Sequence, residues 1–428
     1  YRFPALPPGI YKLTAELPGY KTFVRENIII RVGMIVSIDI KMELTKLEEQ
    51  ITVTAASPTV DVKQSKIAIT VDSNFLRNLP ISRTLTDIVA TAPGAIMSGD
   101  NPMLHGSTVR ANTYQLDGVG INNPAVLSAI TAINFEAIEE VEMVTGGHPA
   151  SVGFTDGLYV NVVTRSGGNK FSTNGTIYLT TKQMAKPLWT DEQYSAFGLA
   201  GPSFDKYNVD SNFNMGGPIL KDKLWFFVSL NYIKIYREIG FIPFTDFLGR
   251  YHPDYDIWSQ YFTPFVKFTT QISPKFRLFA TFQYRDYYSP ISGGGTWSSK
   301  FNQSKRDHDN YYVASLVANY IYSQNTLWDL RLGYVLQDIG YLFQSAVKNE
   351  PRIYDAGSPY GYLTNPRFEE TYLRWRQQFG LHYTHFRDEF LGGDHEIKAG
   401  VEYENSYGDW DTWRKDNMMV YFNSRLPG

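Results

Sequence analysis

The segment that decides the fold class is TLWDLRLGYVLQD, residues 326–338, in which apolar and polar side chains alternate with a period of two. One face carries the large apolar side chains of Trp328, Leu330, Leu332, Tyr334 and Leu336. The opposite face carries Asp329, Arg331, Gly333 and Gln337. Alternation over this length predicts a β-strand with one apolar and one polar face.

The same alternation recurs throughout the chain after residue 170. KFRLFATFQYRD (275–286) and DHEIKAGVEYEN (394–405) repeat it, with Phe279 as an apolar exception on the polar face of the first. We count about nine such segments, near residues 171–181, 208–218, 223–236, 260–272, 275–288, 308–323, 326–345, 370–387 and 394–408. These segments predict one extended antiparallel sheet.

A soluble β-sandwich and a transmembrane β-barrel both give alternating strands, and three features favour the barrel. Many segments have 12 or more residues, whereas sandwich strands have about 5–6. Tyr and Trp lie near the ends of the apolar faces, as in interfacial girdles, and the opposite faces are charged. Tight connections such as 273–274 also alternate with long ones such as 237–258, as periplasmic turns alternate with outer loops.

A barrel makes the direction of each strand face predictable. We expect Phe282, Leu330, Leu332 and Val401 to point outward into lipid, and Arg277, Arg331 and Glu402 to point inward. An unpaired strand edge is costly in lipid, and about nine strands cannot be the whole of an even-numbered bacterial barrel. The chain ends on the turn-like NSRLPG (423–428), so we expect a truncation there and a clipped N-terminal module.

Composition narrows the class of protein further. The net charge of the 428-residue chain is −3, and the absence of a Lys/Arg run gives no indication of nucleic-acid binding. The chain has no Cys, which excludes disulfides and thiolate sites and suits passage through an oxidising periplasm. It opens on Tyr1 without a signal-peptide pattern, and no stretch approaches the about 20 apolar residues of a membrane helix. Membrane residence would therefore be by strands.

The region before the barrel divides into three parts. Residues 1–44 alternate in short segments separated by Pro-Gly turns, which predicts a small β-module. Residues 45–65 form a linker that contains an isolated alternating segment, EEQITVTAASPTVDV (49–63). Residues 66–168 mix short strands with helical pieces such as SRTLTDIVATAPG, where Ser82 is expected to cap the first turn.

Three segments between residues 66 and 168 carry a family resemblance. They are LPISRTLTDIVATAPGAI, HGSTVRANTYQLDGVGINNP and IEEVEMVTGGHPASVGFTDGLYVNVVTRSGG. In this order they resemble the plug domain of TonB-dependent outer-membrane receptors. The plug-motif positions are His105, Gly106, Arg110, Asn112, Asp117, Gly118, Glu142, Gly146, Gly153, Asn161 and Thr164. Two positions depart from the family pattern: His105 replaces a common arginine, and Leu158 replaces the second glycine of a pair.

The resemblance implies the organisation of the rest of the chain. Residues 1–44 are similar to the C-terminal strands of a carboxypeptidase regulatory-like module, residues 66–168 to a plug, and residues 169–428 to the N-terminal part of a barrel. This order is that of the Oar-like and SusC-like branches. In the family a TonB box before the plug adds a strand to TonB, the energy-coupling protein of the inner membrane. The matching positions are Gln50, Ile51, Thr52, Val53, Thr54 and Ala55.

A box that waits for a partner should be unpaired or poorly packed in the isolated receptor, and we expect this of residues 51–55. The alternative is a linker strand that alternates by chance. Asn112, Asn161, Arg110 and Arg165 suit a wet contact between plug and wall, and they suit ordinary loops equally well.

Enzyme interpretations are weak. His382 and His385 are three residues apart on a strand and point to opposite faces, so they cannot readily share a metal. The carboxylates of Glu136, Glu139, Glu140 and Glu142 are expected to form a solvated or plug-edge acidic patch. The sequence implies no cofactor and no catalytic residue.

Two functions remain open. One is TonB-dependent import across the outer membrane of a small or oligomeric nutrient of unknown identity, with TonB, lipid and a surface lipoprotein as candidate partners. The other is a structural or adhesive role in the outer membrane without transport. Both interpretations place residues 1–65 in the periplasm.

Overall fold

The structure is a computed structural model of the whole chain. It describes residues 2–3, 6–44, 50–53, 66–79, 81, 83–98, 101–125, 133–153, 155–186, 189–196, 204–238, 244–245, 251–252, 256–292, 305–343, 352–355, 369–390, 392–413 and 419–422. The predicted capping residue Ser82, the box positions Thr54 and Ala55, and the segment 423–428 lie outside the described residues.

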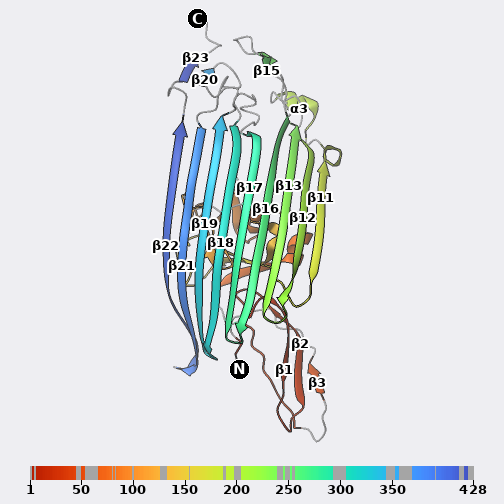
Figure 1. Cartoon of the computed structure of the whole chain (residues 1–428), viewed down its shortest axis with the longest axis vertical. Coiled ribbons are helices and arrows are strands. Elements are labelled where there is room, and N and C mark those ends of the chain that lie inside the picture. The colour runs from red at the N-terminus through yellow and green to blue at the C-terminus, as the bar shows by residue number, and fades with distance from the viewer. Residues whose placement is uncertain are drawn as a thin grey trace.

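The largest sheet, which we call the wall, has nine antiparallel strands among the described residues, ordered as they follow in the chain. They are β11 (Ser172–Thr181), β12 (Phe204–Leu220), β13 (Leu224–Glu238), β16 (Asp256–Ser273), β17 (Phe276–Ser292), β18 (Lys305–Ser323), β19 (Thr326–Phe343), β21 (Glu369–Phe390) and β22 (Gly393–Trp413). Each predicted alternating segment is one of these strands, so the predicted sheet is confirmed. Figure 1 shows them side by side as a curved wall.

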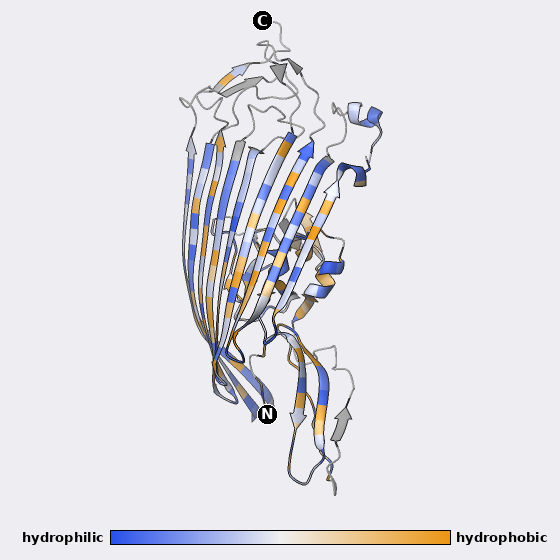
Figure 2. Cartoon of the chain, turned by 45° about the vertical axis from the view of Figure 1, so that its right-hand side comes forward, coloured by the Kyte–Doolittle hydropathy of each residue, from blue (hydrophilic) through white to orange (hydrophobic). Residues whose placement is uncertain are grey.

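The two faces of the wall differ as the alternation requires. Leu332 is 37% exposed, Phe282 45% and Val401 67% on the outer face. Arg331 lies on the inner side beside Gly118, and Arg277 interacts there with Asp117. The predicted directions of these five side chains are confirmed, and Figure 2 shows the alternation as orange and blue steps along the strands.

A second, smaller sheet lies against the concave face of the wall (Figure 1). Its five strands among the described residues are ordered β4 (Ile67–Asp72), β9 (Ile138–Gly146), β10 (Tyr159–Thr164), β7 (Thr113–Leu116) and β8 (Val119–Gly120). We call this the inner sheet. One of its faces carries Val71, Val141 and Val160 into a buried apolar core that also includes Val313 and Val335 of the wall.

Short helices and a hairpin complete the body around the inner sheet. They are α1 (Ser73–Asn78), α2 (Leu85–Val89), η1 (Phe135–Ala137) and the pair β5 (Ala95–Ser98) and β6 (Asn101–Leu104). Asp72 caps α1 by accepting a hydrogen bond from Phe75 N, and Thr84 caps α2. The cap of α2 is therefore Thr84, where the sequence predicted Ser82. In the part of the chain that the structure describes, no helix is long and apolar enough to cross a membrane.

Several small elements lie beyond the ends of the wall strands. They are η2 (Lys182–Met184), α3 (Asp191–Ala196), β14 (Phe244–Thr245), β15 (Tyr251–His252), β20 (Arg352–Asp355) and β23 (Met419–Phe422). β14 pairs with β15, and β20 pairs with β23. They lie at the end of the wall opposite the N-terminal sheet (Figure 1).

The N-terminal sheet contains β1 (Gly9–Ala15), β2 (Thr22–Ile30) and β3 (Gln50–Val53). It projects from the other end of the wall (Figure 1). β3 runs parallel to β2, with Thr22 opposite Gln50 and Arg25 opposite Val53. The expectation that the box segment lacks a sheet partner is therefore wrong for residues 51–53. β1 pairs with one edge of β2, and the other edge would be unpaired without β3. An alternating segment fills such an edge readily.

Candidate functional site: the contact between plug and wall

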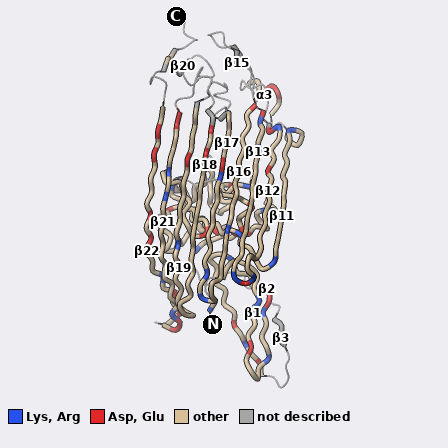
Figure 3. The backbone as a smooth tube through the Cα atoms, viewed as in Figure 1, with Lys and Arg blue, Asp and Glu red and all other residues tan. Residues whose placement is uncertain are grey.

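The inner face of the wall is polar, and the body formed by residues 66–168, the predicted plug, covers it. Buried polar side chains on this face come from six strands: Asn212, Asn231, Lys267, Thr281, Gln283, Gln337, Arg374 and Arg376. A buried polar group is costly unless it is hydrogen-bonded. The plug supplies many of these partners, and Figure 3 shows charged residues along the wall and in the body behind it.

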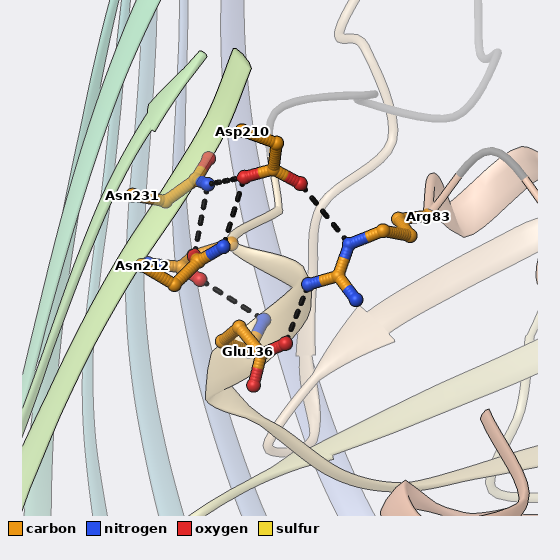
Figure 4. A network of polar contacts seen from close by, with 6 residues as sticks. Arg83, Glu136, Asp210, Asn212 and Asn231 are labelled. Atoms are coloured by element: carbon orange, nitrogen blue, oxygen red, sulfur yellow. Dashed lines mark hydrogen bonds and ion pairs between the residues drawn. The ribbon is translucent and has the colours of Figure 1, made fainter. Parts of the chain in front are cut away.

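Arg83 forms the centre of one such contact (Figure 4). Its Nη2 donates to Glu136 Oε1 in η1, and its Nε donates to Asp210 Oδ2 of β12 at 3.0 Å. Asp210 Oδ1 in turn accepts from Asn212 Nδ2 at 2.8 Å and Asn231 Nδ2 at 2.7 Å. One guanidinium therefore links two segments of the plug to two strands of the wall.

The environment of Arg83 keeps it charged and in place. Burial alone would lower the pKa of Arg83, but the ion pairs with Glu136 and Asp210 outweigh this effect and raise it. The guanidinium carbon lies 4.1 Å from the ring centroid of Tyr178 in β11 and 4.7 Å from that of Phe135. A planar guanidinium suits this combination of a two-carboxylate fork and aromatic faces.

Lys267 of β16 makes a second contact, which is almost fully buried. Its Nζ lies 3.1 Å from Asp117 Oδ2 and donates to Thr164 Oγ1 at 2.9 Å and Thr164 O at 3.1 Å. The side chains of Lys267 and Asp117 are 4% and 2% exposed. Nζ also lies 4.6 Å from the ring centroid of Phe279. This cation–π contact accounts for the apolar exception on the polar face of β17.

Further contacts between plug and wall use backbone and side-chain amides of the plug. Asn134 N donates to Gln283 Oε1 at 3.0 Å, and Asn134 Nδ2 donates to the carbonyl of Thr263 at 2.8 Å. Gly120 N donates to Gln378 Oε1 at 2.9 Å. Asn123 Nδ2 donates to Gln337 Oε1 at 2.9 Å. In these contacts the wall binds the plug through hydrogen bonds between amide and carbonyl groups.

At Gly118 the plug backbone lies close to the wall. The φ of this residue is +84°, and a Cβ added there would lie 3.1 Å from the guanidinium carbon of Arg331. Arg331 Nη1 donates to the Gly118 carbonyl at 3.4 Å. A glycine at this position satisfies both the backbone conformation and the space that is left.

The plug-motif residues predicted from the sequence have different positions. Asp117, Gly118 and Thr164 lie together at the wall, where Thr164 N donates to Asp117 Oδ1 at 2.9 Å. Asn112 is buried inside the plug, and it bonds Pro102 O and Leu158 N instead of the wall. Among the described residues, no hydrogen bond or ion pair to the wall is seen for the remaining positions, which are His105, Gly106, Arg110, Gly146, Gly153 and Asn161.

The expectation of a solvated acidic patch is wrong for three of the four carboxylates, whereas the side chain of Glu139 is 43% exposed. Glu136, Glu140 and Glu142 are 4%, 6% and 5% exposed. Glu136 pairs with Arg83, and Glu142 pairs with Lys66. Each of these three carboxylates is buried because a cation from a distant part of the sequence covers it.

Sequence reasoning missed most residues that join plug and wall, including Arg83, Asn134, Asp210 and Lys267. Their partners are far away in sequence, so no local pattern marks them. The signal that was present is a cation or amide on the polar face of an alternating strand, as for Lys267 beside Phe279.

Comparison with known proteins gives relatives of one kind. No family model matches the chain. The TonB-dependent transporter Oar of Myxococcus xanthus is 30% identical over 243 residues, which are 53% of this chain and 22% of Oar. The chain therefore spans less than a quarter of the length of this curated relative.

Solved structures share the fold at low identity. The outer membrane transporter YddB of Escherichia coli matches 84% of this chain and 50% of its own, with a TM-score of 0.62 and 15% identity. The siderophore receptor PirA of Acinetobacter baumannii matches 79% of this chain and 48% of its own, with a TM-score of 0.58 and 15% identity. The ferric citrate transporter FecA in its unliganded form has a TM-score of 0.55 and 15% identity over 82% of this chain and 49% of its own.

The wall, with its apolar outer face and a separate body bonded to its polar inner face, defines the class of plugged outer-membrane β-barrels. The match to Oar and the shared fold narrow this class. In sequence and in fold, the chain is similar to TonB-dependent outer-membrane receptors and transporters, which supports a location in the outer membrane. These relatives are transporters and receptors rather than enzymes.

Proposed function

We propose that the protein imports a nutrient across the bacterial outer membrane and that TonB drives the movement of the plug. The observation that carries the proposal is the contact between plug and wall. Arg83, Lys267, Gln283 and Gln378 hold the plug through ion pairs and hydrogen bonds to the wall. Water can replace such bonds when the plug shifts. The apolar part of the contact, which includes Val313 and Val335 of the wall, must be exposed as well.

We propose that TonB engages the box at residues 50–55 by strand addition. Backbone hydrogen bonds supply most of the affinity in this mode and demand little of the sequence. The pairing of β3 with β2 gives the box an internal partner that covers one edge. TonB must therefore either displace β2 or pair with the other edge of β3.

The test compares Val53→Pro with Thr52→Ala in the full receptor at equal outer-membrane abundance. Proline removes a ladder donor and fixes φ, so Val53→Pro should abolish cross-linking to TonB and uptake. Thr52→Ala should leave both nearly unchanged because strand addition reads the backbone. Normal cross-linking by Val53→Pro would refute the box.

Deletion of residues 49–56 separates transport from the structural or adhesive alternative. Loss of TonB-dependent growth on complex nutrient mixtures with retained cell attachment supports import. Unchanged growth with this deletion supports the structural role.

A further inference from the structure

A short segment directly after β2 lies on the polar face of the inner sheet. Val32 N donates to Glu140 Oε2 at 2.8 Å. Arg31 Nη2 lies 2.9 Å from Asp72 Oδ2, and its Nη1 lies 3.9 Å from Glu140 Oε1. Asp72 and Glu140 are opposite each other on β4 and β9, so one arginine spans the two strands.

Lys66, the residue before β4, joins the same contact from the other side. Its Nζ pairs with Glu142 and donates to the carbonyl of Gly33 at 2.9 Å. Gly33 has a φ of +66°, and a Cβ added there would collide with Glu142 Oε1 and Lys66 Nζ. A side chain at position 33 would therefore displace the ends of the Lys66 and Glu142 side chains from their contact.

These six residues form one cluster, which we call the loop-base clamp: Arg31, Gly33, Lys66, Asp72, Glu140 and Glu142. Glu140 and Glu142 are 6% and 5% exposed, so they need their cationic partners. Removing one partner of a buried ion pair leaves an uncompensated charge, which is strongly destabilising. The ion pairs of Arg31 with Asp72 and Glu140 therefore form only when the N-terminal sheet is docked on the plug in this position.

The contact between Gly33 and Lys66 closes a loop in the chain. Residues 34–65 leave the clamp at Gly33 and return to it at Lys66. The box at 50–55 lies inside this loop. Along the N-terminal arm, a pull on the box first loads the pairing of β3 with β2 and the backbone contacts of residues 43 and 44 with residues 20 and 21. Along the C-terminal arm, the pull reaches Lys66, and so the clamp, before it reaches the ladder between β4 and β9.

We propose that the loop-base clamp is a mechanical latch between the N-terminal sheet and the plug, and that tension on the box opens it before β4 is displaced. This role rests on the proposed function in one respect, namely that TonB supplies the tension. The docking itself does not depend on TonB. The latch holds the N-terminal sheet on the plug until the box is pulled, and its opening frees the sheet from the plug.

The first experiment measures docking in the full receptor in lipid. The chain has no Cys, so single spin labels can be attached at Glu16→Cys in the N-terminal sheet and Asn74→Cys in α1. The distance distribution should be narrow. Gly33→Ala should broaden it, as should Lys66→Gln, which acts from the plug side and leaves the N-terminal sheet untouched.

Gly19→Ala is the matched control for Gly33→Ala. Gly19 also has a positive φ, +87°, but a Cβ there meets nothing within 4 Å. The two alanines therefore share the backbone cost and differ in the collision with the clamp. A narrow distribution in Gly33→Ala and Lys66→Gln, or equal broadening in Gly19→Ala, would overturn the docking.

The second experiment tests the latch by pulling. A handle is attached to Ser57→Cys in the full receptor in a bilayer. It is pulled from the periplasmic side, in the direction away from the membrane. Release of β3 from β2 should give one early rupture in every variant. A second rupture before plug unfolding should disappear in Gly33→Ala and Lys66→Gln and persist in Gly19→Ala. A second rupture that both clamp variants retain would overturn the latch.

The TonB box and the latch can be refuted independently of each other. The pulling experiment contains no TonB, so normal TonB cross-linking by Val53→Pro would refute the box and leave the latch intact. Loss of the second rupture only in the clamp variants supports the latch whichever partner supplies the tension.

Discussion

Arg83 illustrates how one residue can hold two bodies together. Its φ is +61°, a left-handed conformation that is uncommon for a side-chain-bearing residue. Its side chain reaches a carboxylate of the plug and one of the wall. Arg83 therefore connects the plug to the wall, and a shift of the plug must break its ion pair with Asp210.

Arg83→Gln should loosen the plug without unfolding the wall. Glu136 would keep its burial and lose its cation, at a cost of about 3 kcal/mol, the low end for a broken buried pair because Arg83 retains some exposure. Hydrogen exchange of η1 and β9 should therefore accelerate by about 100-fold. Arg110→Gln, at an exposed position of the plug, is the control, and equal exchange in the two variants would contradict the assignment.

Asp72 gives a pH dependence with a definite sign. The hydrogen bond from Phe75 N, together with Arg31, lowers the pKa of Asp72 below its usual value. A folded pKa below the unfolded value, about 3.9, means that ionised Asp72 stabilises the fold above that pH. This contribution is lost as the pH falls through the lower folded pKa.

Amide exchange at Phe75 should report the loss of this cap. Protection at Phe75 should fall between about pH 4 and the folded pKa of Asp72. Asp72→Asn keeps an acceptor without a titrating charge, so its protection should be flat over the same range. A pH dependence of Phe75 exchange that survives in Asp72→Asn would show that another group is responsible.

Among the elements, β19 gives the most direct test of the wall. Leu332→Arg would place a charge on the outer face at mid-strand, at a cost of about 2–4 kcal/mol near the bilayer midplane. Arg331→Gln, on the inner face, should cost much less. Urea unfolding in lipid vesicles measures both, and similar losses in the two variants would contradict the assignment of the faces.

The strands of the wall could be predicted from the sequence because a period of two is a local property. The ends were less predictable: β21 runs from Glu369 to Phe390, beyond the predicted 370–387. The partner of β3 could not be predicted, since Gln50–Val53 pairs with Thr22–Arg25 across a long separation. The same holds for Glu142, whose burial depends on Lys66 and on Gly33 of the N-terminal sheet.

At the scale of the whole molecule, wall and plug are stabilised in different ways. Each inner strand of the wall is hydrogen-bonded along its length to two neighbours. The plug is held to the wall by a smaller number of side-chain contacts. We expect urea to expose amides of Val141 and Val160 to exchange before those of Leu316 and Leu332. Simultaneous exchange of both groups would show one cooperative unit.

The register of β18 against β19 has a consequence for how such a chain can change length. The pairing is continuous from Lys305 opposite Phe343 to Ile321 opposite Leu327. A single residue inserted at the middle of β19 would turn every later side chain to the other solvent, so that charged groups would enter lipid and apolar groups would enter water. An insertion of two residues would preserve the parity and only shift the depth of the strand. Length variation within the wall should therefore occur in even steps, and odd steps should be confined to the turns.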